Sequence, residues 1–146
     1  MKKLLVAVLC ILGFSQCKHK VYSLENLPKQ FIEIGSYGGF AGTSNSYFFF
    51  PNGQRFSNSS VIGTIKLSPN EIEKADKKRF KTMLKGLKTI NFKDMDLNET
   101  GNMTYFVRLK TKKGDKKIQW SNMNTAPQEL VKFYRESTKN INSNAI

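Results

Sequence analysis

An apolar run near the start of the chain limits which residues can contribute to a folded domain. Leu4 to Phe14 contains only apolar residues, follows Lys2 and Lys3, and leads into Ser15. The run is too short to cross a bilayer as a helix. A positive start, a short apolar stretch and a polar exit are typical of a secretory signal peptide. We therefore predict that residues 1–16 are a signal peptide and that the fold begins after them.

Cys17 stands directly after this segment. The arrangement resembles the signal of a bacterial lipoprotein, in which a cysteine after the apolar region becomes the first mature residue. In that family this cysteine carries the lipid, which includes palmitate. The resemblance implies lipid attachment at Cys17 and a protein anchored to a membrane of the bacterial cell envelope. An ordinary secretory signal beside a free Cys17 is the alternative, because Gln16 stands where the family has Gly or Ala.

Removal of residues 1–16 from the 146 leaves 130 residues, and the formal charge of +13 falls to +11 with the loss of two lysines. Cys10 is lost with them, so the mature chain can form no internal disulfide. The 11 Phe and 5 Tyr of the whole chain are far more than a disordered chain of such charge carries. We predict a tether over 17–29, a single domain over 30–139 and a flexible tail over 140–146.

The first half of the domain reads as strands. Phe31 to Ser36 alternates apolar and polar residues, and the glycine-rich segment 38–42 then predicts a bend or bulge with Phe40 buried beneath it or displayed on it. Tyr47 to Phe50 runs into Asn52-Gly53, which predicts a hairpin that returns over 55–57. Another short strand is expected over 61–67.

A long helix is expected next, with Ser68 as N-cap, Pro69 at its first position and Glu71 as the capping-box partner. Apolar residues recur at helical spacing from Ile72 to Leu87. A second stripe on the opposite side is basic and contains Lys74, Lys78, Lys81, Lys85 and Lys88.

The second half predicts a loop over 91–102 with Phe92 and Leu97 as anchors, a strand over 103–111, a turn over 113–116 and a partner strand over 117–121. A second helix opens at Thr125, again with capping-box spacing. Strands, helix, hairpin and helix in this order predict an α+β fold with a mainly antiparallel sheet and two helices packed on one face.

Catalytic chemistry is scarce in this sequence. His19 is the sole histidine and no mature thiol remains free, which excludes Ser-His-Asp and Cys-His catalysis and a His- or Cys-ligated zinc site. Asp94, Asp96 and Asn98 begin like a calcium loop, but Glu99 and Tyr105 occupy the positions that need Gly and a bidentate Glu. We therefore predict a protein that is not an enzyme and needs no cofactor or metal. Carboxylate chemistry from Asp94, Asp96 or Glu99 is the weakest alternative.

The order of these features resembles emfourin, a family of small proteinaceous inhibitors of thermolysin-like metallopeptidases. The similarity rests on the segment Gly38-Gly39-Phe40-Ala41-Gly42, on the helix that ends near Phe92, on Tyr105, and on the closing helix from Pro127 to Tyr134. It covers about two-thirds of the mature chain. The resemblance implies that the glycine segment is a contact loop.

We therefore expect a non-catalytic envelope lipoprotein that binds a protein partner, with a peptidase as the most specific candidate. The expected contact residues are Tyr37, Gly38, Gly39, Phe40 and Ala41. The alternative assigns binding of anionic glycan or lipid headgroups to the lysine stripe. Nucleic acid is not expected, because an exported protein rarely meets it.

Overall fold

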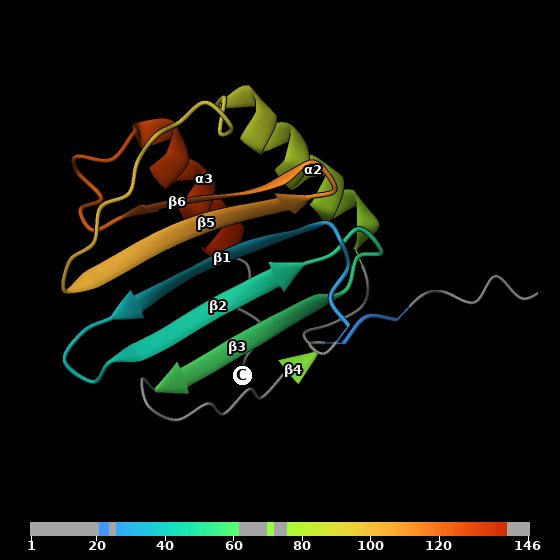
Figure 1. Ribbon diagram of the computed structural model, residues 1–146, viewed down its shortest axis with the longest axis horizontal. Coiled ribbons are helices and arrows are strands. Elements are labelled where there is room, and N and C mark those ends of the chain that lie inside the picture. Colours follow the sequence, from blue (N-terminus) through green and yellow to red (C-terminus); the bar gives the residue numbers. More distant parts are fainter. Residues whose placement is uncertain (1–20, 24–25, 62–69, 72–75, 140–146) are drawn as a thin grey trace, which may run out of the picture.

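A six-stranded antiparallel sheet with two helices on one face forms the domain in the computed structural model (Figure 1). The structure describes residues 21–23, 26–61, 70–71 and 76–139. The strand order is β4-β3-β2-β1-β5-β6. This architecture confirms the predicted α+β class. The elements are β1 (Phe31–Gly38), β2 (Thr43–Phe49), β3 (Arg55–Val61), β4 (Asn70–Glu71), α2 (Lys77–Thr89), β5 (Met103–Thr111), β6 (Gly114–Trp120) and α3 (Gln128–Lys139).

The main core lies between the sheet and the helices. Because side chains alternate across a strand, Ile32 and Ile34 of β1 point toward the helices together with every second residue of β5 and β6. The sheet contributes Val107, Leu109, Ile118 and Trp120, and the helices contribute Phe80, Met83, Leu87, Leu130, Val131 and Tyr134.

The start of α2 differs from the prediction. Asn70 and Glu71 form strand β4, paired with Ser57 and Phe56, and so cannot open a helix. The N-cap is Asp76, whose carboxylate accepts a hydrogen bond from the Arg79 backbone N–H at 3.0 Å. The Asp76 N–H in turn donates to the Gly53 carbonyl at 3.0 Å, which ties the helix start to the β2–β3 turn. Ser68, Pro69 and residues 72–75 lie outside the described residues.

The end of α2 is a Schellman motif. Asn91 adopts the left-handed conformation with φ 52°, and its N–H donates to the Lys88 carbonyl at 3.1 Å. The Phe92 N–H donates to the Leu87 carbonyl at 3.0 Å, and both side chains are buried. Phe92 is therefore an anchor of the following loop, as predicted, and Leu97 is a second, partly buried one.

Strands β2 and β3 are longer than predicted. The Asn52-Gly53 hairpin is confirmed, with Gly53 at φ 91°, but β2 already begins at Thr43 and β3 continues through the polar residues Asn58 to Ser60 to Val61. Backbone pairing with β2 holds this polar stretch in the sheet. The strand predicted over 61–67 lies beyond Val61, outside the described residues.

Two boundaries in the second half also differ. The β5–β6 loop consists of Lys112 and Lys113 alone, because Thr111 pairs with Gly114, so β6 begins three residues earlier than predicted. Before α3, the Thr125 hydroxyl donates to the Asn122 carbonyl at 3.5 Å instead of capping the helix. The predicted strand over 103–111 matches β5.

The pairing of β1 gives the domain two distinct ends. Phe31 pairs with Lys110, so the start of β1 lies beside the β5–β6 turn, and Gly38 pairs with Met103 at the other end. We call these the tether end and the loop end. The eight residues of β1 separate them by about 25 Å.

The segment that leads into β1 is fixed at the tether end. Tyr22 donates its backbone N–H to Gln54 Oε1 at 2.8 Å, and its ring lies 5.6 Å from that of Phe50. Phe50 belongs to a second buried cluster, which forms on the sheet face that carries no helix, with Phe31, Phe48 and Phe56. The chain therefore enters the domain at a defined place.

Candidate functional site

The predicted contact loop is the turn between β1 and β2. Gly38, Gly39 and Gly42 all have positive φ angles, which favour glycine. The Gly42 N–H donates to the Gly39 carbonyl at 3.0 Å and closes the turn. The Gly39 N–H donates to the Asn102 carbonyl at 2.6 Å and attaches the turn to the start of β5. A Cβ at Gly38 would overlap the same Asn102 carbonyl, so this loop is tightly held at its base.

Phe40 occupies the tip of this turn with an exposed fraction of 109%. Of the two alternatives for the glycine segment, the structure shows the displayed loop. Met103, with 36% exposed, lies beside the loop base, where its Cε would stand 3.9 Å from a Cβ at Gly39. Val61, with 52% exposed, pairs with Thr43 at the same end of the sheet. Three large apolar side chains are therefore exposed around one end of the domain.

The other predicted contact residues do not all share this position. Gly38 and Gly39 form the base of the turn and Ala41 is exposed beside Phe40. Tyr37 lies on the open sheet face, where its hydroxyl donates to Gln119 Oε1 at 3.2 Å. Tyr37 is thus part of the sheet surface, where its side chain contacts β5 and β6.

An aromatic and basic surface surrounds Tyr37 on the open face. The Lys117 ammonium lies 4.6 Å from the ring centroid of Phe106 and 5.2 Å from that of Tyr37, close enough for cation–π attraction. Gly35 lies between Phe106 and Ser46 in the pairing register, and its missing side chain leaves room for the Phe106 ring.

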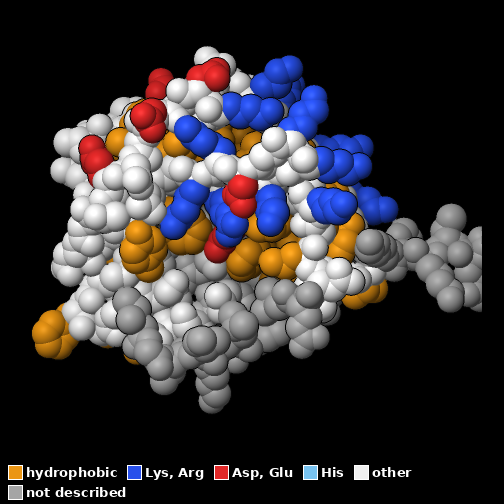
Figure 2. Space-filling view, viewed as in Figure 1, with side chains coloured by type: hydrophobic (Ala, Val, Ile, Leu, Met, Phe, Trp, Pro, Cys, Tyr) orange, Lys and Arg blue, Asp and Glu red, His pale blue; other side chains and the backbone are white. Residues whose placement is uncertain are grey.

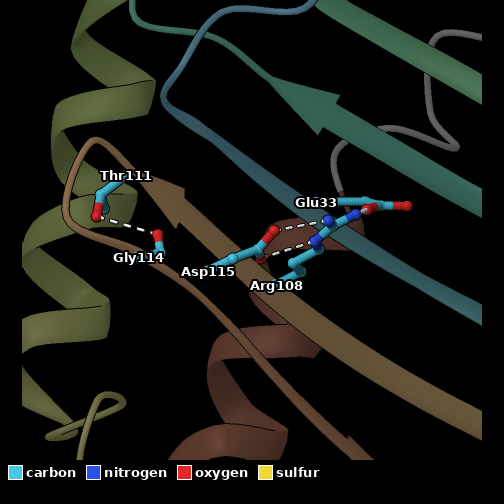
Figure 3. A network of polar contacts seen from close by, with 5 residues as sticks. All are labelled: Glu33, Arg108, Thr111, Gly114 and Asp115. Carbon is cyan, nitrogen blue, oxygen red and sulfur yellow. Dashed lines mark hydrogen bonds and ion pairs between the residues drawn. The ribbon is translucent and has the colours of Figure 1, made fainter.

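A carboxylate–guanidinium network lies on the same face, nearer the tether end (Figure 3). Arg108 donates from Nε to Asp115 Oδ1 at 2.9 Å and from Nη2 to Asp115 Oδ2 at 2.7 Å, a two-bond pairing. Its Nη1 reaches Glu33 Oε2 at 3.4 Å. The guanidinium also lies 5.5 Å from the Phe31 ring centroid. All three nitrogens of the Arg108 guanidinium therefore donate to carboxylates within the domain.

The two carboxylates respond differently to this network. Burial raises the pKa of Glu33 above its ordinary value, against the opposing effect of Arg108. The hydrogen bonds from Arg108 lower the pKa of the more exposed Asp115. Two carboxylates with opposite shifts are found in some acid–base sites, but here both oxygens of Asp115 accept hydrogen bonds from Arg108, which also contacts Glu33. The contacts of Arg108 link β1, β5 and β6 on this face.

The predicted lysine stripe is present on the described part of α2. Lys78, Lys81, Lys85 and Lys88 are all exposed, while Lys74 lies outside the described residues. Within the part of the chain that is described, none of these four forms an ion pair. Their charge is therefore available to a partner.

The stripe belongs to a larger basic surface that the sequence reasoning missed. Lys and Arg side chains gather over α2 and the turning end of β5 and β6, at the upper right of Figure 2. Two neighbouring hollows connect the elements: one of about 450 Å³ is lined by Lys88 and Lys93, and one of about 220 Å³ by Lys93, Lys113 and Lys116. The lysine-rich stretch over 110–117 was the signal that could have revealed it.

Neither a metal site nor a membrane-spanning helix is found in the described ranges. No group of three or more His, Cys, Asp or Glu residues there is placed to hold a metal ion. No described helix has the length and apolar character needed to cross a bilayer.

Comparison with models of known protein families, with curated proteins and with solved structures yields no match. The resemblances to lipoprotein signals and to emfourin therefore stay predictions.

Proposed function

We propose that this protein is a non-catalytic, lipid-anchored protein of the bacterial cell envelope that binds a protein partner through its β1–β2 loop. The observation that carries the proposal is the full exposure of Phe40 at the tip of a turn with a fixed base. An exposed aromatic side chain on a preorganised loop suits insertion into an apolar pocket, because little conformational entropy is lost on binding.

The position of the loop supports the same function. The segment from Val21 enters at the tether end, and the loop end lies about 25 Å away across β1. A lipid on Cys17 would thus leave Phe40 directed away from the membrane surface. Met103 and Val61 would extend the apolar contact around the loop.

A peptidase is the most specific partner class. A loop that enters an active-site cleft needs a rigid scaffold and no catalytic group of its own, and the structure has both a held turn and a packed sheet behind it. The emfourin resemblance of the Gly38–Gly42 segment adds the metallopeptidase class to this proposal.

The test immobilises the whole chain and exposes it to envelope and secreted proteins at physiological salt, with identification by mass spectrometry. The captured protein is then titrated against wild type, Phe40→Ala and the control Leu27→Ala, whose exposed apolar side chain lies in the segment at the tether end. Phe40→Ala should lose about 2 kcal/mol of binding free energy, which weakens binding about 30-fold. Leu27→Ala should bind like wild type.

Three outcomes would oppose the proposal. Equal binding by wild type and Phe40→Ala removes the loop from the contact. An equal loss in Leu27→Ala shows that the contact is not specific to the loop end. A partner that is a peptidase but keeps full activity when saturated with the protein excludes inhibition while leaving the binding itself.

A further inference from the structure

The lysines at the tether end form a surface that shares only Lys88 with the α2 stripe and lies apart from the contact loop. Lys88 lies in the last turn of α2 and Lys93 follows the helix, while Lys112, Lys113 and Lys116 belong to the β5–β6 hairpin. We call these five residues the tether-end lysines. The sequence separates the two groups, but in the fold Lys88, Lys93, Lys113 and Lys116 line the two hollows described above. Lys112 is the exposed neighbour of Lys113 in the β5–β6 turn.

We propose that the tether-end lysines bind the anionic headgroups of the membrane in which Cys17 is anchored. This inference rests on the proposed lipid anchor, but not on the partner or on Phe40. It assigns the basic surface an orienting role: it would hold the domain with its tether end against the membrane and its loop end outward.

The length of chain between anchor and domain supports this occupant. Four residue steps separate Cys17 from Val21, and a fully extended chain of that length spans at most about 14 Å. Tyr22 is then fixed to the β2–β3 turn, so the tether end cannot move far from the anchor. A surface held this close to headgroups meets them at high effective concentration.

The chemistry of the surface is also complementary to a lipid headgroup layer. The larger hollow is lined by apolar side chains, among them Leu84 and Leu109, together with Lys88 and Lys93. A surface that combines lysines with apolar side chains matches the headgroup region of a membrane, where lipid phosphates meet the acyl chains. Val21 and Leu27 add exposed apolar side chains in the segment that enters at this end.

Two carboxylates face the same hollows. Asp115 lines the smaller one, but both of its oxygens accept hydrogen bonds from Arg108, which offsets its charge. Asp94 lines the larger one and is exposed beside Lys93. Five lysines against these two carboxylates, one of them paired, leave a clear positive excess.

The test reconstitutes the full lipidated chain in vesicles of neutral phosphatidylcholine and in vesicles that also contain phosphatidylglycerol. An amine-reactive reagent modifies exposed lysines, and mass spectrometry gives the rate at each site. We expect Lys112 and Lys113 to react several-fold more slowly in the anionic vesicles, and the rates to recover at about 0.5 M salt. Lys132, exposed on α3, should react equally in both.

Two double variants distinguish the effect of the tether-end lysines from the effect of net charge. Lys93→Gln with Lys116→Gln removes two tether-end lysines and should weaken docking about 30-fold, which abolishes the protection of Lys112 and Lys113. Lys132→Gln with Arg135→Gln removes the same charge from exposed positions of α3 and should leave the protection intact.

Equal labelling in the two kinds of vesicle would overturn the proposal, as would equal loss of protection in both variants. Protection that requires added acidic polysaccharide instead of anionic lipid would overturn it in favour of a glycan ligand. Failure of the chain to float with any vesicle would refute the lipid anchor and this inference together. A chain that floats without protection refutes only this inference and leaves the proposed function standing.

Discussion

The open face of the sheet depends on a residue without a side chain. Gly35 in β1 pairs with Phe106 on one side and Ser46 on the other, and both are buried. A Cβ at Gly35 would lie 2.8 Å from Phe106 Cζ and 2.8 Å from Ser46 Cβ, and it would also overlap the Asn45 carbonyl oxygen. Backbone cannot yield as a flexible side chain can, so Gly35→Ala must displace a strand or expel the Phe106 ring.

Overpacking of this kind costs about 2–3 kcal/mol. For a domain of this size that corresponds to a fall in Tm of roughly 10 °C. Gly114→Ala is the matched control, because a Cβ there would meet nothing within 4 Å and its φ is not in the left-handed region. We expect its stability to be unchanged or about 0.5 kcal/mol higher.

Urea and thermal unfolding, followed by circular dichroism, measure both variants against wild type. Equal stability of Gly35→Ala and wild type would refute the reasoning, since it would mean that the Phe106 ring does not need the space above β1. A loss in Gly114→Ala as large as that in Gly35→Ala would show that the cost comes from glycine replacement in general.

Three further perturbations test other parts of the structure. The raised pKa of Glu33 means that the folded state binds its proton more tightly than the unfolded state does, so the free energy of unfolding should fall as pH rises above about 4.5. Glu33→Gln should remove this fall. Urea titrations at pH 4 and pH 7 would contradict the expectation if wild type and Glu33→Gln changed in parallel. Asp76→Ala should cost about 1 kcal/mol through the lost helix cap, read from the urea midpoint, and Asp76→Asn should recover most of it. Asn91→Ala should cost about 1 kcal/mol in the same assay, and Asn91→Gly should not, because only the alanine is strained at φ 52°; equal effects would exclude backbone strain as the cause.

The parts of the fold that could be predicted are those in which local pattern and burial agree. Ile32 and Ile34 alternate with polar neighbours because one face of β1 packs on the helices, and the same reasoning gave β5 its correct ends. Asn52-Gly53 marked its turn correctly because the turn places Gly53 at a positive φ of 91°, which favours glycine.

The errors arose where distant contacts decide local structure. Ser68 to Glu71 has the composition of a helix start, yet Asn70 and Glu71 pair with β3, and α2 instead begins where Asp76 can donate its N–H to Gly53. The polar residues Asn58 to Ser60 of β3 lack strand propensity and are held in the sheet by their pairing with β2.

The candidate site shows the same division. The glycines of residues 38–42 predicted a special backbone, but only the structure shows that Phe40 is displayed rather than buried. The lysine stripe followed from helical spacing, whereas its continuation to Lys113 and Lys116 depends on how the β5–β6 hairpin lies beside the end of α2. A one-dimensional pattern carries no information about such neighbours.

The central position of β1 has a mechanical consequence. The proposed anchor is attached before its first residue, and the proposed partner binds at the loop after its last. Tension between membrane and partner would therefore run along β1, perpendicular to its hydrogen bonds with β2 and β5. Those bonds share the load instead of breaking one after another, so the strand that connects the two attachment points is also the one best placed to resist being pulled out.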